Sequence, residues 1–400
     1  MGSLPPASAE FGGVVKAPRG PTFLVSSMSN QSQPRVAVIG GGVIGVSSAY
    51  HLARSGAKVH LVTEGRLANG ASGRSLSWLN SAAIRSEHYH RLRMIGIDRY
   101  RTLFAQQPNQ HWLRFDGGLS WQSDDRAQAV GKIHTHQLAR GYDSHLLTPD
   151  EVGVRMPGVE AAAIPASGAI WNPGEGWVDL PSLISYLSED LVGRGGELII
   201  DAGEATVTTS GGRVTGVTAV GQGAIEVDAA LLATGAKAPS MVAQFGVTIP
   251  DATLMALLVR TRPVQTQLRA VLNTPRVSVR PTPDGGLAVD SDWTEPHIGM
   301  RADGAFWVPA EIVEQLLAEA SRVLAGGPLL TADTQGVGPK PIPGDGEPVL
   351  GQLGDIDGLH IAFTHSGATL ALIVGELLAQ QIITGQPHPL LRPYSPHRFH

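Results

Sequence analysis

The stretch Arg35-Val-Ala-Val-Ile-Gly-Gly-Gly-Val-Ile-Gly45 indicates how this 400-residue chain begins to fold. Arg35–Ile39 is a β-branched run that ends at glycine, which is typical of a buried parallel strand. Residues 43–55 repeat apolar side chains at helical spacing, and Gly56 ends that pattern. Residues 58–63 form a second predicted strand. Because strand, helix and strand follow within about 30 residues, we expect a right-handed βαβ unit with parallel strands.

The loop of this unit carries the glycine spacing of a dinucleotide-binding turn. Gly40 permits the tight turn, Gly42 lets the backbone approach a pyrophosphate, and Gly45 lets the helix pack against the strand. The phosphates would then lie at the helix N-terminus, at Val43 and Ile44. Glu64 ends the second strand, where a carboxylate binds ribose hydroxyls and repels a 2′-phosphate, so NADP is disfavoured. The spacing alone leaves NAD and FAD open, and a packing loop without ligand is the alternative.

Composition excludes several classes of function. The chain has a net charge of −5, a pI near 6.3 and no cysteine. Without a basic excess, a nucleic acid is not an expected partner. The absence of cysteine excludes disulfides, thiolate catalysis, a flavin linked through sulfur and the usual zinc sites. The 14 histidines form no HExxH motif, so no metal is predicted.

The ends of the chain give expectations about location. Residues 1–34 are rich in Gly, Pro and Ser, and we interpret them as a disordered leader or an over-long start, with Met28 as the alternative initiator. They lack the continuous apolar segment of about 7–15 residues that a secretory signal needs. No stretch reaches the roughly 18–20 apolar residues of a membrane span, since 359–383 is interrupted by polar side chains. We therefore expect a cytoplasmic protein without a membrane span.

The order of predicted elements gives the fold class. It runs α/β, helical, α/β, β-rich and again α/β, which predicts a Rossmann-like α/β domain, discontinuous in sequence, with an interleaved α+β substrate domain on an antiparallel sheet. The predicted helices after the first unit are 89–104, 124–140, 180–193, 310–324 and 368–384. The predicted strands are 197–200, 229–235 and 358–363, with a meander at 206–227 and β alternation over 254–307. The nucleotide domain takes 35–90, 150–245 and 335–388, and the substrate domain takes 91–149 and 246–334.

Five further segments resemble motifs of one family. They are Asn69-Gly-Ala-Ser-Gly-Arg-Ser-Leu-Ser-Trp78, Pro173-Gly-Glu-Gly-Trp-Val-Asp179, Ala229-Leu-Leu-Ala-Thr-Gly235, Lys340-Pro-Ile-Pro-Gly-Asp-Gly-Glu-Pro-Val-Leu-Gly351 and Thr364-His-Ser-Gly-Ala-Thr-Leu370. Together with the glycine loop they resemble the D-amino acid oxidase superfamily of flavoproteins, which includes glycine and sarcosine oxidases and dehydrogenases. The resemblance covers residues 35–385 and implies that the nucleotide is FAD.

The resemblance also implies which residues hold FAD. The final helix, beginning near Ala368, would direct its free N–H groups and positive dipole end at the N1/C2=O edge of the flavin. Such stabilisation is comparable to one oxyanion-hole donor, about 2.7–4 kcal/mol. The predicted FAD-binding residues are Gly40, Gly42, Val43, Ile44, Gly45, Glu64, Ser72, Gly73, Arg74, Ser75, Gly235, Gly367, Ala368, Thr369 and Leu370.

The activity implied by the resemblance is oxidation of the C–N bond of an amine or amino acid. Hydride would pass to flavin N5 and leave an imine, and O2 or another acceptor would reoxidise the flavin. The candidate catalytic residues are His365, Lys340, Arg280 and Asn80. Lys340 stands where amino-acid oxidases of the family carry an arginine that grips the substrate carboxylate. Because lysine lacks the planar fork, the expectation of a simple α-amino acid is weaker.

Other functions stay open at this point. The same fold oxidises 2-hydroxy acids and other alcohols, and a flavin-binding protein without turnover or an NAD-dependent dehydrogenase would share the first motif. His365 and Lys340 each have a structural alternative, as a helix-entry histidine and as a lysine of a proline-rich loop. The sequence carries no signal for the oligomeric state or for the general base.

Overall fold

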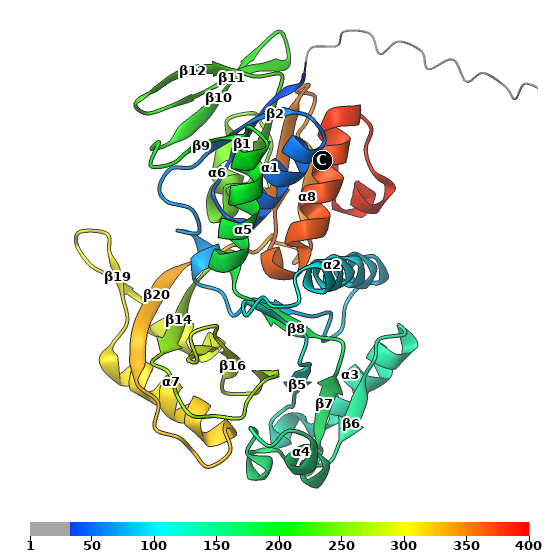
Figure 1. Ribbon diagram of the computed structural model, residues 1–400, viewed down its shortest axis with the longest axis vertical. Coiled ribbons are helices and arrows are strands. Elements are labelled where there is room, and N and C mark those ends of the chain that lie inside the picture. The colour runs from blue at the N-terminus through cyan, green and yellow to red at the C-terminus, as the bar shows by residue number, and fades with distance from the viewer. Residues whose placement is uncertain (1–32, 400) are drawn as a thin grey trace, which may run out of the picture. The chain divides into compact units, whose positions relative to one another are not determined.

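The computed structural model describes residues 33–399, so the predicted leader, 1–34, with Met28 lies outside the described residues except for Gln33 and Pro34. Two large sheets organise these residues (Figure 1). The predicted domain boundaries stay a prediction. Strand pairing places residues 169–172, inside the predicted 150–245 segment, in the second of the two sheets.

The first sheet has six strands and contains the βαβ unit. In spatial order they are β21 (Val349–Gln352), β22 (Leu359–Phe363), β13 (Ala229–Leu232), β1 (Arg35–Ile39), β2 (Lys58–Val62) and β9 (Glu197–Ile199). All neighbours are parallel except β21, which is antiparallel to β22. Val38 lies opposite Leu61 on one side and Leu231 on the other, and all three are fully buried. The predicted parallel βαβ unit is therefore confirmed.

Helices cover this sheet, with α1 (Val43–Arg54) packed between α5 (Leu180–Gly193) and α8 (Gly367–Thr384) (Figure 1). The predicted helices 43–55, 180–193 and 368–384 agree with these bounds to within one residue. Of the described helices, only α8 is long and apolar enough to cross a membrane. Most of its residues are buried against α1 and α2 in the core, which accounts for its apolar composition.

The second sheet has eight strands, which are mostly antiparallel. In spatial order they are β20 (Ala332–Lys340), β14 (Leu254–Thr261), β17 (Leu287–Asp290), β16 (Ser278–Pro281), β15 (Val271–Asn273), β5 (Gly118–Ser120), β7 (Ala169–Asn172) and β6 (His145–Leu147). Its separate hydrophobic core includes residues of α7 (Ala310–Val323) and α4 (Pro149–Arg155). The β alternation expected over 254–307 is interrupted at 292–297, which form a 3₁₀ helix containing Pro296, a residue without a ladder N–H.

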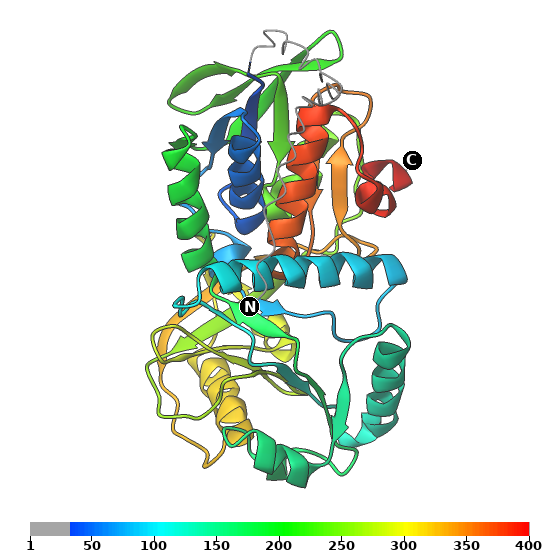
Figure 2. The ribbon, with the colours of Figure 1, turned by 45° about the vertical axis from the view of Figure 1, so that its right-hand side comes forward.

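A small sheet and one long helix lie next to α8. Figure 2 shows α2 (Glu87–Gln106) crossing the ends of α1 and α8, and a Cβ on Gly96 of α2 would lie 2.4 Å from the Thr369 carbonyl oxygen. The small sheet has the order β3 (Trp78–Leu79), β8 (Gly176–Val178) and β4 (Leu113–Arg114). Because α2 approaches α8 this closely, its side chains reach the first turn of α8.

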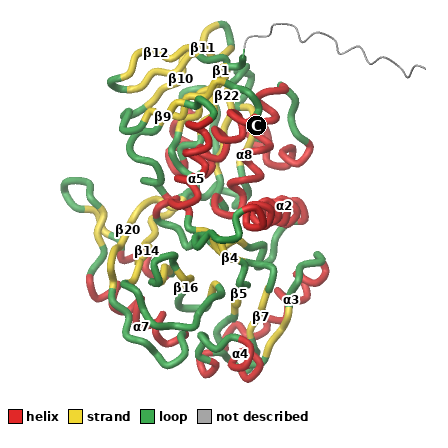
Figure 3. The backbone as a smooth tube through the Cα atoms, in the orientation of Figure 1, coloured by secondary structure: helices red, strands yellow, loops and turns green. Residues whose placement is uncertain are grey.

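The remaining elements complete the chain (Figure 3). The predicted meander is confirmed as β10 (Ala205–Ser210), β11 (Arg213–Ala219) and β12 (Gln222–Glu226). The others are α3 (Ala127–Ala139), α6 (Ala238–Ala243), β18 (Gly299–Met300), β19 (Phe306–Trp307) and the 3₁₀ helices η1 (Ala71–Gly73), η2 (Asp124–Arg126), η3 (Ala161–Ala163), η4 (Gly235–Lys237), η5 (Asp292–His297), η6 (Pro389–Tyr394) and η7 (Pro396–Phe399).

Candidate functional site

The glycine loop follows β1 at the carboxyl edge of the six-stranded sheet. Gly40 has φ +125°, and a Cβ there would lie 2.3 Å from the Ala233 carbonyl oxygen at the end of β13. A Cβ on Gly45 would lie 2.0 Å from the carbonyl oxygen of Gly40. Both positions therefore need glycine for close backbone contact. The N–H of Val43 donates to Oγ of Ser72 at 2.9 Å, which holds the segment of η1 over the start of α1.

A second helix start lies beside the first. α8 begins after β22, and a Cβ on Gly367 would be 3.8 Å from Val43 and 4.0 Å from Ile44. Gly235, with φ +58°, follows β13, the strand between β22 and β1. The N–H groups of the first turn of each helix have no intrahelical acceptors, and both helix dipoles present their positive ends. The structure thus brings the predicted cofactor residues of three chain segments to one sheet edge.

Two polar atoms at this edge have no hydrogen-bond partner among the described residues. They are Oγ1 of Thr234, which follows β13, and Nε of Arg74, which follows η1. The Arg74 side chain lies on β20, where a Cβ on Gly338 would be 2.6 Å from Nε. Buried donors without an acceptor are costly and are satisfied by ligands. With the glycine loop and the two helix starts, these donors fit a dinucleotide with phosphate and carbonyl oxygens.

Other predicted cofactor residues show local contacts of their own. Glu64 lies just after β2 with its side chain half exposed, and it pairs with Nζ of Lys237 at 2.5 Å. Its predicted contact with ribose stays a prediction. Ser75 accepts from the N–H of Ser77, a buried residue with φ +57°. A Cβ on Gly73 would lie 2.4 Å from the Ala68 carbonyl oxygen, so the turn around η1 also needs a glycine.

Asn80 lies in a buried polar cluster at the first turn of α8. Its Oδ1 accepts from Nη2 of Arg93 at 2.9 Å, and its carbonyl oxygen accepts from Nε of Arg93 at 2.7 Å. The N–H of Asn80 donates to Oγ1 of Thr369. Arg93 also donates to Oγ of Ser366, the residue that precedes α8, and only 2% of Arg93 is exposed. Arg93 is not among the residues predicted from the sequence, although an arginine within an otherwise apolar helix face is a visible signal.

His365 and Lys340 lie within electrostatic reach of each other. More than a third of His365 is exposed, yet desolvation by the surrounding protein, followed by the charges of Lys340 and Arg93, lowers its pKa to about 4. Nζ of Lys340 pairs with Glu295 at 2.6 Å and with Asp292 at 3.2 Å. Although burial opposes its charge, these carboxylates raise the pKa of Lys340. The lysine charge is therefore already balanced, and its contact with substrate stays a prediction.

Arg280 is fully buried on β16 beneath the segment that follows η1. It donates to the carbonyl oxygens of Leu76 and Pro281 and lies 3.5 Å from Oδ1 of Asp179. Its guanidinium carbon is 5.2 Å from the centre of the Trp177 ring. These contacts join the eight-stranded sheet to the N-terminus of α5, since Asp179 caps that helix. A direct role of Arg280 in binding an anion stays a prediction.

Glu175 is a second residue of the site that was not predicted from the sequence, although it lies in the Pro173–Asp179 motif. It is fully buried, and Nε1 of Trp78 donates to one carboxylate oxygen at 2.7 Å, while the Tyr142 hydroxyl donates to the other. Burial raises the pKa of Glu175 to about 8. A Cβ on Gly118 would lie 2.1 Å from this carboxylate, so β5 leaves the space that the carboxylate occupies.

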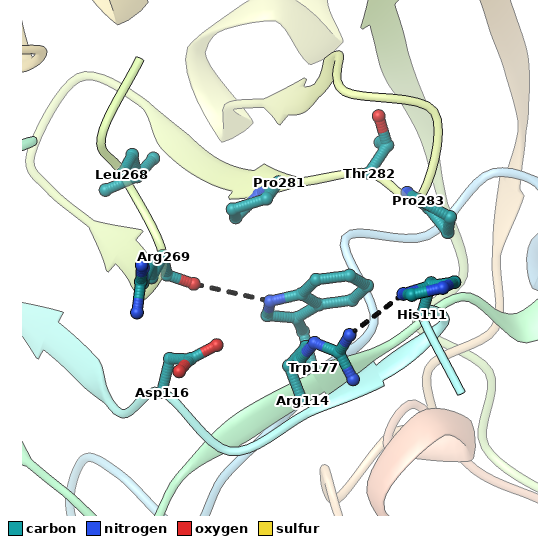
Figure 4. A pocket seen from close by; sticks show the side chains of 9 residues that line it. All are labelled: His111, Arg114, Asp116, Trp177, Leu268, Arg269, Pro281, Thr282 and Pro283. Carbon is teal, nitrogen blue, oxygen red and sulfur yellow. Dashed lines mark hydrogen bonds between the residues drawn. The ribbon is translucent and has the colours of Figure 1, made fainter. Parts of the chain in front are cut away.

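A pocket of about 320 Å³ opens beside Trp177 (Figure 4). Nε1 of Trp177 donates to the carbonyl oxygen of Arg269 at 3.4 Å, and the Arg114 guanidinium lies 3.2 Å from Nδ1 of His111 in the pocket lining. None of the predicted cofactor or catalytic residues lines it. The residues predicted from the sequence to bind FAD or to act in catalysis therefore lie outside the lining of this pocket.

Comparison with known proteins identifies the family. Residues 35–381 match the family described as FAD dependent oxidoreductase (DAO). The chain belongs to this family. Its cofactor is FAD, in agreement with the glycine loop and the two helix starts. The resemblance inferred from the five motifs and the predicted fold class are thus confirmed for this FAD-dependent oxidoreductase.

Relatives of this FAD-dependent oxidoreductase differ in length. A glycine oxidase of Pseudomonas aeruginosa is 28% identical over 383 residues, which cover 90% of this chain and 98% of that protein. Mouse mitochondrial sarcosine dehydrogenase is 23% identical over 98% of this chain, but the chain spans only 43% of that protein. The solved structure of glycine oxidase from Geobacillus kaustophilus has a TM-score of 0.76 at 21% identity, covering 91% of this chain and 98% of that one. The solved structure of iminodiacetate oxidase from Chelativorans sp. has a TM-score of 0.75 at 23% identity, covering 90% of this chain and 99% of that one.

We expect Glu175→Gln to change how the stability of this FAD-dependent oxidoreductase depends on pH. The folded protein keeps the Glu175 proton up to about pH 8, whereas the unfolded chain releases it near the ordinary value of 4.5. Folding therefore binds an extra proton between these values, and this residue makes stability fall as the pH rises through that range. Thermal melts between about pH 5 and pH 8.5, which cover most of the interval between these two pKa values, should show a smaller fall in melting temperature for Glu175→Gln than for the original protein. Parallel melting curves for both proteins would show that Glu175 is ionised in the folded state.

Proposed function

We propose that the enzyme oxidises the C–N bond of an amine or amino acid. The observation that carries the proposal is the paired start of α1 and α8, with Asn80, Arg93 and Ser366 packed at the first turn of α8. Relatives of nearly the same length are named glycine oxidase, and a similar fold is titled iminodiacetate oxidase. FAD, when bound, supplies the two-electron acceptor for hydride from the carbon next to nitrogen.

The residues of this chain provide positioning and charge. The first N–H groups of α8 and its dipole stabilise negative charge placed before Gly367. Arg93 fixes the Asn80 side chain and the Ser366 hydroxyl, so these groups need no reorganisation during the reaction. His365, neutral at pH 7, is available as a hydrogen-bond partner at the start of α8. Holding the substrate C–H in one orientation accounts for much of the rate in such reactions.

The proposal is tested by anaerobic reduction of the bound flavin with two matched panels. One panel contains amines, α-amino acids and N-alkyl amino acids, and the other contains the corresponding alcohols and 2-hydroxy acids. We expect members of the first panel to bleach the flavin absorbance and the second to leave it unchanged. Bleaching by 2-hydroxy acids alone would establish alcohol oxidation, and a yellow protein that no compound bleaches would indicate a flavin-binding protein without turnover. A colourless purified protein would favour an NAD-dependent dehydrogenase.

The proposed electron acceptor is O2 or another oxidant, and the proposed location is the cytoplasm. Burial of α8 in the core supports this location, because its apolar surface is already used within the protein. Reoxidation of the reduced enzyme by air, followed as return of the flavin absorbance within one turnover, identifies an oxidase. Slow return in air with rapid return on adding an artificial acceptor identifies a dehydrogenase.

A further inference from the structure

Two arginines, Arg85 and Arg93, lie beside the first turn of α8. The guanidinium carbons of Arg85 and Arg93 lie 5.5 Å and 5.4 Å from the centre of the Tyr89 ring. The Tyr89 hydroxyl donates to Oγ of Ser366 at 2.6 Å, which places both cations next to the start of α8. Between residues 33 and 399, no carboxylate forms an ion pair with either guanidinium.

Arg85 and Arg93 differ in how many of their side-chain N–H donors already have an acceptor. Arg93 is almost fully buried, and its Nε, Nη1 and Nη2 all donate to Asn80 or Ser366. Arg85 is partly exposed, and its side chain donates through Nε to the Ala82 carbonyl oxygen. Within the described chain its two terminal nitrogens have no acceptor. The two terminal nitrogens of Arg85 are therefore available to an acceptor outside the described chain. The guanidinium of Arg93, which its hydrogen bonds hold in place, lies nearby.

The local charge balance favours an anion. Burial and the charge of Arg93 lower the pKa of Arg85 to about 10, so Arg85 stays charged at pH 7 although the neighbouring guanidinium repels it. The acid that acts on Arg85 from a distance is Glu175, whose own pKa of about 8 leaves it largely protonated. The dipole of α8 adds to the positive potential. Such uncompensated charge beside a helix start is stabilised when an anion binds.

The backbone around Arg85 is held in an unusual conformation. Ala83 has φ +66° and Ser77 has φ +57°, and these two residues bracket the segment that carries Trp78 and Asn80. Left-handed backbone at residues other than glycine is strained and gathers at functional sites. The segment leading to Arg85 therefore carries backbone strain at two positions.

Lys340 is the alternative residue for binding an anionic substrate group. It occupies the motif position at which amino-acid oxidases of the family carry an arginine that binds the substrate carboxylate. Its ammonium is 2.6 Å from Glu295 and 3.2 Å from Asp292, so two carboxylates already surround it. An additional carboxylate would be repelled by these two acids. A guanidinium fork without acidic partners binds a carboxylate through two parallel hydrogen bonds.

We propose that Arg85, backed by Arg93, binds the carboxylate of the substrate, so that the enzyme acts on amines that carry a carboxylate group. This specificity rests on the proposed amine oxidation. The carboxylate would pair with the two free nitrogens of Arg85, next to the first turn of α8. Arg93 acts as a positioning residue, because all three of its nitrogens already hold Asn80 and Ser366.

The test measures carboxylate binding without turnover. Acetate and benzoate are titrated into the FAD-loaded enzyme at constant ionic strength, with acetamide and benzamide as uncharged matches, and the change in oxidised-flavin absorbance gives Kd. We expect Arg85→Gln to weaken carboxylate binding roughly 10- to 100-fold, and Arg85→Lys to weaken it less. The matched control is Arg91→Gln, an exposed arginine of α2, which should leave Kd unchanged. Lys340→Gln tests the alternative residue.

Each outcome decides the proposal. Unchanged carboxylate affinity in Arg85→Gln, or a loss confined to Lys340→Gln, overturns it. Loss of FAD from Arg85→Gln with normal carboxylate affinity of the remaining holoenzyme assigns Arg85 to the cofactor and also overturns it. If Arg85→Gln does not fold, the Kd of Arg85→Lys for acetate is compared with that of the original protein, provided that the two melting temperatures agree. An unchanged Kd then overturns the proposal. If no amine reduces the flavin, the proposed function fails, whereas the acetate titration still tests the carboxylate site.

Discussion

Gly40→Ala is expected to give a protein that no longer retains FAD after purification. The new Cβ would lie 2.3 Å from the Ala233 carbonyl oxygen, and the backbone at φ +125° is one that alanine rarely adopts. Because the closest atoms that the new Cβ would meet belong to the backbone of Ala233, no side chain can move aside to make room. The loop between β1 and α1 must therefore move away from β13. Overpacking of this kind costs about 1–3 kcal/mol of stability, and each 1.4 kcal/mol lost from binding weakens it about tenfold. The flavin absorbance per chain after gel filtration measures the effect.

Gly56→Ala is the matched control for this prediction. Gly56, which follows α1, also has positive φ, +86°, but no atom lies within 4 Å of its ideal Cβ position. Alanine there introduces backbone strain without a collision, so we expect a lower melting temperature with normal FAD content. Full FAD retention in Gly40→Ala would show that the loop does not need its contact with β13 to hold the cofactor.

Asp179→Ala is expected to destabilise the protein by about 3–5 kcal/mol, the cost of leaving a buried charge unpaired. Asp179 is 4% exposed, pairs with Arg260 at 3.0 Å and with fully buried Arg280 at 3.5 Å, and caps α5 through the N–H of Ser182. Its removal leaves Arg280 without its ion-pair partner and α5 without its cap. Chemical denaturation with equal slopes for both proteins gives the difference in the free energy of unfolding.

Two controls separate the charge from the cap. Asp179→Asn keeps an oxygen for the Ser182 N–H but removes the charge, so it should recover only the capping contribution, about 1 kcal/mol. Asp190→Asn removes an exposed acid that pairs with Arg194 and should change stability by less than about 0.5 kcal/mol. If Asp179→Asn matches the original protein, the charge pair with Arg280 contributes nothing to stability.

Asp179 should also make the stability of the protein depend on pH in the acidic range. Although burial opposes its charge, Arg280 and Arg260 hold the pKa of Asp179 below its ordinary value of 3.8. A carboxyl whose pKa is lowered by folding stabilises the protein above the ordinary pKa, and this stabilisation is lost as the pH falls through the folded value. The difference in stability between the original protein and Asp179→Asn should therefore shrink as the pH is lowered through 4 and below.

Much of the architecture was predictable because its signals are local. The β-branched run at 35–39, the glycines after it and the apolar spacing of 43–55 predict β1, the loop and α1, and the structure confirms them. Glycine at Gly40 and Gly45 is required by backbone atoms a few ångströms away. The motifs at Lys340–Gly351 and Thr364–Leu370 likewise indicated the family before any contact was known, and the family match confirms it.

The sequence therefore determined the βαβ unit by itself, since backbone conformation and hydrophobic periodicity are properties of short segments. The family and FAD followed from the resemblance of its motifs to those of the family, which the family match confirms. The tertiary structure alone decided which charges are paired. Lys340 pairs with Glu295, which is 45 residues away in the sequence, and Arg93 donates to Ser366, which is 273 residues away. A side chain is available to a ligand only if no partner neutralises it, and the partners come from elements that the fold brings together. For that reason Arg85, and not the lysine of the motif, keeps donors beside α8 that no group within residues 33–399 accepts from.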